Sequence, residues 1–295
     1  MRSPLSLLFS FFVLLGFLST LSSSRAIETV VNGSNSFNTT NNISSSVSGW
    51  SSGWGTGNTN TGWNYVGTDA SGNGTASAVY LGSGWVLMAG HEGTPGAFTL
   101  DGNVYNTNGL YYSDFFTNTF GSSIGTSNTD LTLFNILTTS TTGTNLTLSS
   151  LKLTSNAPSI GSQVVMIGYG GASGVSSESW GTNIINSRNI TQPVSGGGNT
   201  YTNIDFTTPG GTSYSALILG DSGGGAFISA SGTWELAGIN EAVNSGTSYF
   251  VQLSAYSSQI NKIVDSVPEP GTWALLGIGS LVIFCFAFRS RGKNT

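Results

Sequence analysis

The sequence predicts an all-β domain that ends in a single helix. Short segments rich in Thr, Val, Ile and aromatic residues alternate with Gly, Asn and Ser, as strands and turns do in sandwiches and barrels. No stretch of ten or more residues keeps a helical period before residue 254. With 295 residues, the chain is long enough for one large β domain or two small ones.

Six segments carry the clearest strand pattern: 76–81, 85–89, 131–137, 164–169, 226–229 and 234–239. One amphipathic segment, residues 254–265, predicts a terminal helix packed on the β domain. Its apolar positions at helical spacing are Tyr256, Ile260, Ile263 and Val264. Residues 27–62 form a low-complexity lead-in rich in Asn, Ser, Gly and Thr, and we expect most of it to be flexible.

The composition argues against several classes of function. Residues 27–266 hold 3 basic and 12 acidic side chains, and a surface with this balance repels the phosphates of nucleic acids. One cysteine, Cys285, cannot form an internal disulfide, and together with the single histidine, His91, it cannot build an ordinary zinc site. Glycine-rich phosphate-binding motifs are also missing. We therefore expect no nucleic-acid partner, no metal and no organic cofactor.

The first 26 residues have the organisation of a secretory signal peptide. Arg2 precedes an apolar run over residues 5–18, and Ser24 and Ala26 are the small residues before a cleavage site. The run is short for a membrane span, so an N-terminal anchor is the weaker alternative. We expect export and removal of residues 1–26 by signal peptidase.

The last 29 residues, 267–295, have three parts. Pro268, Glu269 and Pro270 come first, the apolar segment 272–288 follows, and a tail with three basic residues ends the chain. Seventeen apolar residues are the lower limit for a transmembrane helix, and the basic tail would stay in the cytoplasm.

This ending resembles the PEP-CTERM sorting signal. The resemblance implies a Gram-negative-type bacterium, recognition and removal of the signal by an exosortase, and transient membrane contact through residues 272–288. It also implies delivery to the cell surface, outer membrane or extracellular matrix. A generic C-terminal anchor is the alternative, and the two differ only in whether the helix is retained.

A nucleophilic serine is predicted in the segment GDSGGGAF, residues 220–227. Gly220 and Gly223 can adopt backbone angles that other residues resist, which would expose the Ser222 hydroxyl on a tight turn. The N–H groups of Gly220 and Ser222 would then form an oxyanion hole beside it. A plain glycine-rich hairpin is the alternative.

Such a serine needs a base and a carboxylate that orients the base. His91 is the only histidine and follows a strongly β-like run on a glycine-flanked turn. Asp130 opens an apolar strand, whereas the competing Asp101 and Asp114 do not. A structural or exposed histidine and a turn-forming aspartate are the alternatives.

Together, residues 82–91, 129–133 and 220–224 resemble the trypsin/chymotrypsin-like serine protease family. The separations of 39 and 92 residues are close to the roughly 45 and 93 residues of the chymotrypsin triad. The resemblance covers residues 63–265 and implies a double six-stranded β-barrel with the site in the cleft between the barrels. It also assigns the catalytic roles: His91 as base and then acid, Asp130 as its orienting partner, and Ser222 as nucleophile.

Some positions depart from the family pattern. Gly90 and Glu92 replace the Ala and Cys that usually flank the histidine, and Gly225 replaces a Pro. We expect Glu92 to raise the pKa of His91 and to shift activity to higher pH.

Two further positions bear on activation and specificity. Asp221 pairs with a new N-terminal amine in activated family members, but Ile27 is too distant for this, so we expect Asp221 to be satisfied locally. Ala216 is at the position that forms the floor of the P1 pocket. Because Ala216 carries no charge, we expect a preference for apolar or small P1 residues rather than Lys or Arg.

The sequence thus favours a secreted serine endopeptidase, with residues 63–266 as the protease domain and a protein or peptide as substrate. The main alternative is a protease-like fold without catalysis that serves as a binding or matrix protein at the cell surface. A polysaccharide-active enzyme would need paired carboxylates across a cleft, and no motif supports one.

Overall fold

The computed structural model describes ten stretches of the chain: 29–31, 34–36, 38–55, 59–72, 74–113, 115, 129–170, 177–196, 198–211 and 214–266. The predicted signal peptide, the motif Pro268, Glu269 and Pro270, and the apolar segment 272–288 lie outside the described residues. No helix within the described stretches is long and apolar enough to cross a membrane.

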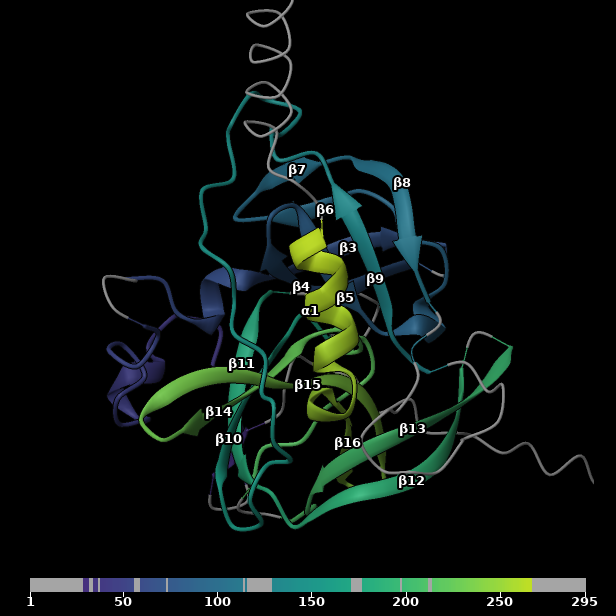
Figure 1. The fold of residues 1–295 in the computed structure, drawn as a ribbon. Helices are drawn as coiled ribbons and strands as arrows, with labels where there is room; N and C mark the ends of the chain where they lie inside the picture. The colour runs from purple at the N-terminus through teal and green to yellow at the C-terminus, as the bar shows by residue number, and fades with distance from the viewer. Residues whose placement is uncertain are drawn as a thin grey trace, which may run out of the picture.

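The first sheet has seven antiparallel strands in the order β7-β6-β3-β4-β5-β9-β8. Their bounds are β3 Val66–Ser71, β4 Gly74–Gly82, β5 Trp85–Met88, β6 Phe98–Leu100, β7 Asn103–Tyr105, β8 Thr107–Tyr112 and β9 Thr132–Ile136. The edge strands β7 and β8 are separated in the chain by Asn106 alone. A single stretch of chain therefore joins the two edges, and the sheet is curled (Figure 1).

The second sheet repeats this arrangement in the order β11-β10-β14-β15-β16-β13-β12. Its strands are β10 Gln163–Gly168, β11 Ser179–Ile184, β12 Ser187–Gly196, β13 Asn199–Thr208, β14 Gly225–Ala230, β15 Thr233–Asn244 and β16 Thr247–Gln252. Only residues 185–186 separate the edge strands β11 and β12. Each sheet has seven strands rather than the expected six, because a short interruption divides one long strand into two. The interruption is Asn106 in the first sheet and residues 185–186 in the second.

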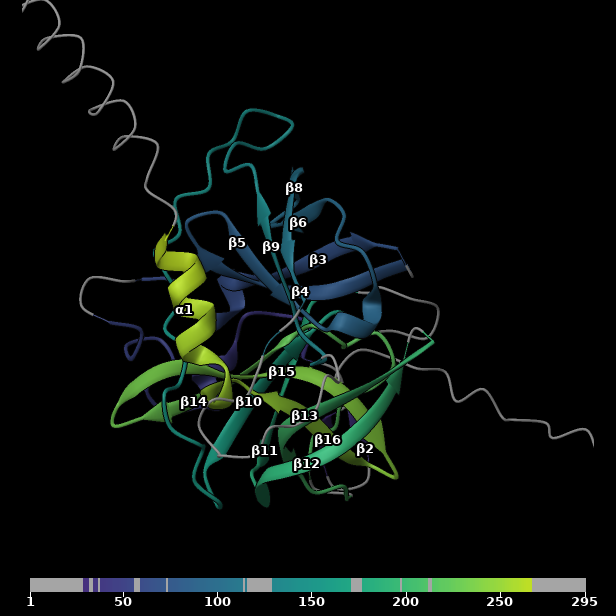
Figure 2. The same ribbon diagram turned by 45° about the vertical axis from the view of Figure 1, so that its right-hand side comes forward.

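Of the two hydrophobic clusters among the described residues, the larger spans both sheets, and the smaller, which includes Met166 and Phe250, belongs to the second sheet. The larger contains Leu87 and Phe134 from the first sheet and Val165 and Leu236 from the second, all fully buried. The two sheets are therefore held in a fixed relation through shared packing (Figure 2).

The predicted terminal helix is confirmed as α1, Ser257–Ser266, preceded by the 3₁₀ turn η4, Leu253–Ala255. It begins three residues later than the start of the predicted segment because η4 occupies the first positions. Its predicted apolar side chains face the core, with Tyr256 and Ile260 buried and Ile263 and Val264 partly buried against it. Figure 2 shows α1 beside the junction of the two sheets.

The expected flexibility of the lead-in is wrong for residues 43–54. Besides β1 Thr29–Val31, β2 Ser34–Ser36 and the 3₁₀ turns η1 Ile43–Ser45 and η2 Gly62–Tyr65, the lead-in contributes four buried side chains: Ile43, Val47, Trp50 and Trp54. The Trp50 ring lies 4.8 Å from the ring of Trp234 on β15, between centroids. The rings of Trp50 and Trp54 pack on the second sheet, against Phe227 of β14 and Trp234 of β15. The Ser- and Gly-rich composition of the lead-in gives no sign of this packing, because the surface that these rings contact lies far away in the sequence.

Candidate active site

His91 and Asp130 are brought together by strand pairing. His91 lies in the 3₁₀ turn η3, Gly90–Glu92, three residues after the end of β5, and Asp130 lies two residues before β9 begins. Strands β5 and β9 pair antiparallel with Met88 opposite Thr132. Both strands are fully buried, so their ends hold the two side chains at a constant separation.

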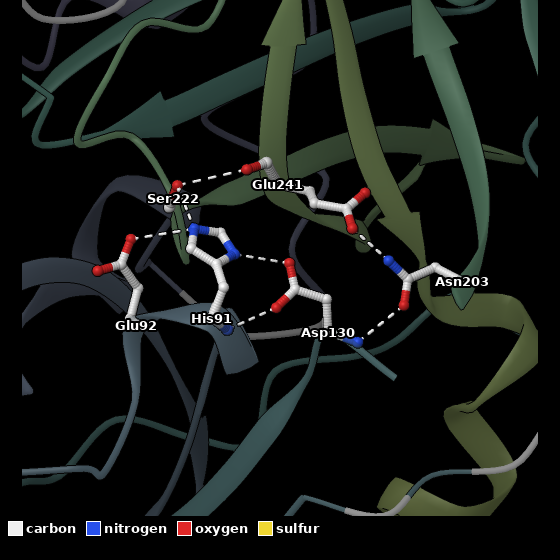
Figure 3. Close-up of polar contacts among 6 residues, drawn as sticks. All are labelled: His91, Glu92, Asp130, Asn203, Ser222 and Glu241. Carbon is white, nitrogen blue, oxygen red and sulfur yellow. Dashed lines mark hydrogen bonds and ion pairs between the residues drawn. The ribbon is translucent and has the colours of Figure 1, made fainter. Parts of the chain in front are cut away.

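The side chains of Asp130, His91 and Ser222 form one continuous hydrogen-bonded row (Figure 3). His91 Nδ1 lies 2.7 Å from Asp130 Oδ2, and His91 Nε2 lies 3.0 Å from Ser222 Oγ. The backbone N–H of His91 also donates to Asp130 Oδ1, at 2.6 Å. Asp130 is fully buried and therefore has a fixed orientation. Of the carboxylates weighed from the sequence, Asp101 is exposed on the β6–β7 turn and Asp114 lies outside the described residues.

The turn that carries Ser222 requires its glycines. Gly220 has φ of +91° and Gly223 has φ of +85°, both in the left-handed region. A Cβ atom at Gly223 would also lie 1.9 Å from the carbonyl oxygen of Ser77 on β4. Ser77 fixes the turn further, because its N–H donates to the Ser222 carbonyl and its hydroxyl donates to the Gly220 carbonyl. The nucleophile turn of the second sheet is thus tied to the first sheet.

The backbone N–H groups around the turn have different partners. Those of Asp221, Gly223 and Gly224 donate to carbonyl oxygens of Ile218, Asn240 and Asp221, respectively. The N–H groups of Gly220 and Ser222 have no hydrogen-bond partner within the described stretches.

Asp221 is satisfied locally, as predicted. It is fully buried, and its two carboxylate oxygens accept the N–H groups of Gly170 at 2.8 Å and Ile218 at 2.9 Å. Burial raises the pKa of Asp221 to about 7, although these two bonds oppose the shift. The carboxyl group thereby joins the nucleophile turn to the end of β10.

Glu92 contacts the same imidazole nitrogen as the serine. Its Oε1 lies 3.2 Å from His91 Nε2. Burial alone lowers the pKa of His91, but the hydrogen bonds and charges of Asp130 and Glu92 outweigh it and raise that pKa to about 10. The predicted effect of Glu92 on the pKa of His91 is confirmed in direction.

Two residues behind the row were missed from the sequence. The N–H of Asp130 donates to Asn203 Oδ1 at 2.7 Å, and Asn203 Nδ2 donates to Glu241 Oε1. The carbonyl of Glu241 in turn accepts a hydrogen bond from Ser222 Oγ, at 3.3 Å. Glu241 is the extra residue of a β-bulge in β15, between Asn240 and Ala242. Its sequence signal was weak, because the same strand also carries Glu235 and Asn240.

Ala216 is partly buried, and its neighbours hold the local backbone. The Ser215 hydroxyl accepts the N–H of Thr182, and the Leu217 N–H donates to Ser248 Oγ. A cavity of about 220 Å³ lies beside the triad and is lined by uncharged residues that include Tyr111, Leu131, Thr132 and Tyr201. Ala216 does not line this cavity.

The C-terminal resemblance is confirmed by comparison with protein families. Residues 266–291 match the family model of the PEP-CTERM protein-sorting motif. The motif indicates export and sorting to the cell surface, and it implies processing by an exosortase-type enzyme. No curated protein matches the chain.

Solved structures similar to this chain are proteases. The inactive form of the Rv3671c protease is 14% identical and covers 68% of this chain and 89% of its own, with a TM-score of 0.48. The active form, from M. tuberculosis, is 14% identical, has a TM-score of 0.48, and covers 70% of this chain and 83% of its own. Kallikrein-related peptidase 10 is 16% identical, has a TM-score of 0.46, and covers 70% of this chain and 97% of its own. In this chain, the described residues form two curled sheets and one short C-terminal helix.

Proposed function

We propose that the chain is a secreted serine endopeptidase. The observation that carries this proposal is the hydrogen-bonded row from Asp130 through His91 to Ser222, with distances of 2.7 and 3.0 Å. In this mechanism Ser222 Oγ attacks the peptide carbonyl while neutral His91 takes its proton. His91 then returns the proton to the leaving amine, and water hydrolyses the acyl-enzyme by the same route. Asp130 keeps the imidazole in one tautomer and stabilises its charged form.

The N–H groups of Gly220 and Ser222 form the proposed oxyanion hole. Both belong to a turn whose shape is held by Ser77 and by the buried carboxyl group of Asp221. Donors fixed in advance stabilise the developing negative charge without reorganising during the reaction.

The domain organisation belongs to the same proposal. Each sheet closes as a six-strand barrel once β7–β8 and β11–β12 are each counted as one bent strand. Residues 63–266 form the protease domain, after a signal peptide over 1–26 and the lead-in over 27–62. Residues 267–295 form the sorting signal, whose segment 272–288 contacts the membrane transiently before processing.

The substrate is a protein or peptide, with an apolar or small residue preferred at P1. Ala216, at the proposed floor of the P1 pocket, contributes no charge that would bind Lys or Arg. The natural setting is the bacterial cell surface, the outer membrane or the extracellular matrix, to which the sorting motif directs the chain.

A fluorophosphonate probe tests the activated serine. The purified full chain should form a single adduct on Ser222, located by peptide mass spectrometry. Ser222→Ala should abolish the adduct, whereas Ser159→Ala, at an exposed serine, should leave it unchanged. A folded, monodisperse protein that forms no adduct at any pH between 6 and 10 would contradict the proposal.

One observation favours a second candidate, a protease-like binding protein without catalysis. Glu92 contacts His91 Nε2, and a His91 pKa of about 10 keeps the imidazole protonated at neutral pH. A protonated imidazole cannot accept the proton of Ser222. This candidate predicts a folded chain whose Ser222 is unreactive at neutral pH, where the imidazole is protonated.

A further inference from the structure

Three carboxyl groups meet behind His91. Asp130 and Asp205 are fully buried, and Glu241 is 3% exposed. Asp130 accepts two donors from His91. In contrast, three carboxyl oxygens have no hydrogen-bond partner among the described residues: Oδ1 and Oδ2 of Asp205 and Oε2 of Glu241. Buried acceptors without a donor are unfavourable. The three carboxyl groups therefore cannot all be ionised, and at least one of them carries a proton.

Lysine and arginine do not supply the missing positive charge. The described residues include three such side chains, and each is engaged or exposed elsewhere. Lys152 pairs with Glu235, Arg188 donates to two backbone carbonyls of residues 157–158, and Lys262 is exposed on α1. The cation that faces the cluster is His91, whose Nδ1 lies 2.7 Å from Asp130 Oδ2.

Four groups are packed around Glu241, and the two carboxyls among them favour its neutral form. The four are Asp130 before β9, Asp205 and Asn203 on β13, and the phenol of Tyr256 before α1. Burial, followed by the negative charges of Asp205 and Asp130, raises the pKa of Glu241 well above its usual range. Burial and the charge of Asp130 also raise the pKa of Asp205. Two facing carboxyl groups without a cation share at least one proton.

We propose that Glu241 is a neutral carboxylic acid, paired with Asp205, and that it is a positioning residue for the triad. Its Oε1 accepts from Asn203 Nδ2, which turns Asn203 Oδ1 toward the N–H of Asp130. Its backbone carbonyl accepts from Ser222 Oγ, so one bulge residue contacts Ser222 directly and Asp130 through Asn203 (Figure 3). The positioning role rests on the proposed function of Ser222; the protonation state does not.

The neutral form also protects the chemistry at His91. An ionised Glu241 would place a second buried negative charge beside Asp130, which would raise the pKa of His91 further and make its proton harder to remove. A protonated histidine cannot act as the base. The proton on Glu241 therefore leaves a single carboxylate, Asp130, to orient the imidazole.

The kinetic test compares a neutral isostere with a truncation. Glu241→Gln keeps a carbonyl acceptor for Asn203 and should label with fluorophosphonate within about threefold of the wild-type rate, whereas Glu241→Ala should label about 10²-fold more slowly. Glu235→Gln is the matched control, because Glu235 is also buried on β15 but pairs with Lys152 instead. If Glu241→Gln is as slow as Glu241→Ala while both remain folded by circular dichroism, a carboxylate is required and the proposal is overturned.

Two spectroscopic readouts do not depend on activity. The infrared spectrum of the wild-type chain at pH 7 should contain a carbonyl band of a protonated carboxylic acid that Glu241→Gln removes and Glu235→Gln retains. The NMR signal of the His91 Nδ1 proton should move in Glu241→Ala and stay in place in Glu241→Gln. If the wild type and Glu241→Gln have the same infrared spectrum in this region, the proposal that Glu241 is a neutral acid is refuted. If the His91 Nδ1 proton signal does not move in Glu241→Ala, the positioning role of Glu241 is refuted. If the wild type fails to label, the proposed function fails while these two measurements still decide the inference.

Discussion

His91 Nε2 lies 3.2 Å from Glu92 Oε1, the carboxylate of the next residue in the chain. The same nitrogen lies 3.0 Å from Ser222 Oγ. With a protonated imidazole, the Nε2 proton is shared between these oxygens, and the Ser222 hydroxyl donates to the carbonyl of Glu241 instead. Activation of the serine then requires His91 to lose this proton.

Glu92→Gln should move the labelling rate of Ser222 to lower pH. The charge and hydrogen bond of Glu92 help to raise the pKa of His91 to about 10, so their removal lowers that pKa. The fraction of neutral imidazole at a given pH rises, and the ascending limb of the rate profile shifts toward neutral pH. Rates of fluorophosphonate labelling between pH 6 and 10 measure the shift, with Glu235→Gln as control. An unaltered profile in Glu92→Gln would refute this role.

Cleavage of a peptide library should occur after apolar or small residues. Ala216, at the proposed floor of the P1 pocket, carries no charge, so a Lys or Arg side chain gains no ion pair with it. Mass spectrometric identification of the cleaved bonds reports the preference, with Ser222→Ala as the background control. Rapid cleavage after Arg would overturn the expectation.

Asp69→Asn should stabilise the chain at high pH. Asp69 is fully buried on β3 and accepts the N–H of Gly96, and burial raises its pKa to about 7. Because the folded pKa exceeds the ordinary value of 3.8, this group destabilises the fold increasingly as pH rises from about 4 to 7. An upward shift of about three units corresponds to at most about 4 kcal/mol.

Urea unfolding of wild type and Asp69→Asn at pH 4 and pH 8 measures this effect. The variant should gain stability relative to wild type only at pH 8, where the wild-type carboxyl is ionised. A difference in unfolding free energy that is equal at both pH values would show that Asp69 does not titrate with a raised pKa.

Trp50→Ala should destabilise the fold by about 3–5 kcal/mol, because the ring is 1% exposed and its removal leaves a cavity. The ring packs against Trp54 and Trp234 with centroid distances of 4.8 Å to each. Urea unfolding monitored by circular dichroism measures the loss, and Ser51→Ala, at an exposed neighbouring position, should change stability little. A loss below about 1 kcal/mol would show that this part of the lead-in does not stabilise the domain.

Strands with buried, uninterrupted apolar runs could be predicted from the sequence. The six predicted segments coincide with β4, β5, β9, β10, β14 and β15, each of which is largely buried. The hairpin of β12 and β13 was not predicted. Edge strand β12 carries Pro193 and exposed polar residues, so its alternation of apolar and polar side chains is weak.

The sequence by itself determined the local chemistry: the glycine turn around Ser222, the histidine after a buried strand, the aspartate before another, and the sorting motif at the C-terminus. Each of these signals spans only a few consecutive residues, so it can be read without the fold. Only the tertiary structure decided that Trp50 packs in the core and that Asn203 and Glu241 stand behind Asp130. Such contacts join residues far apart in the chain, and the burial that gives a polar side chain its protonation state exists only after the sheets have packed together.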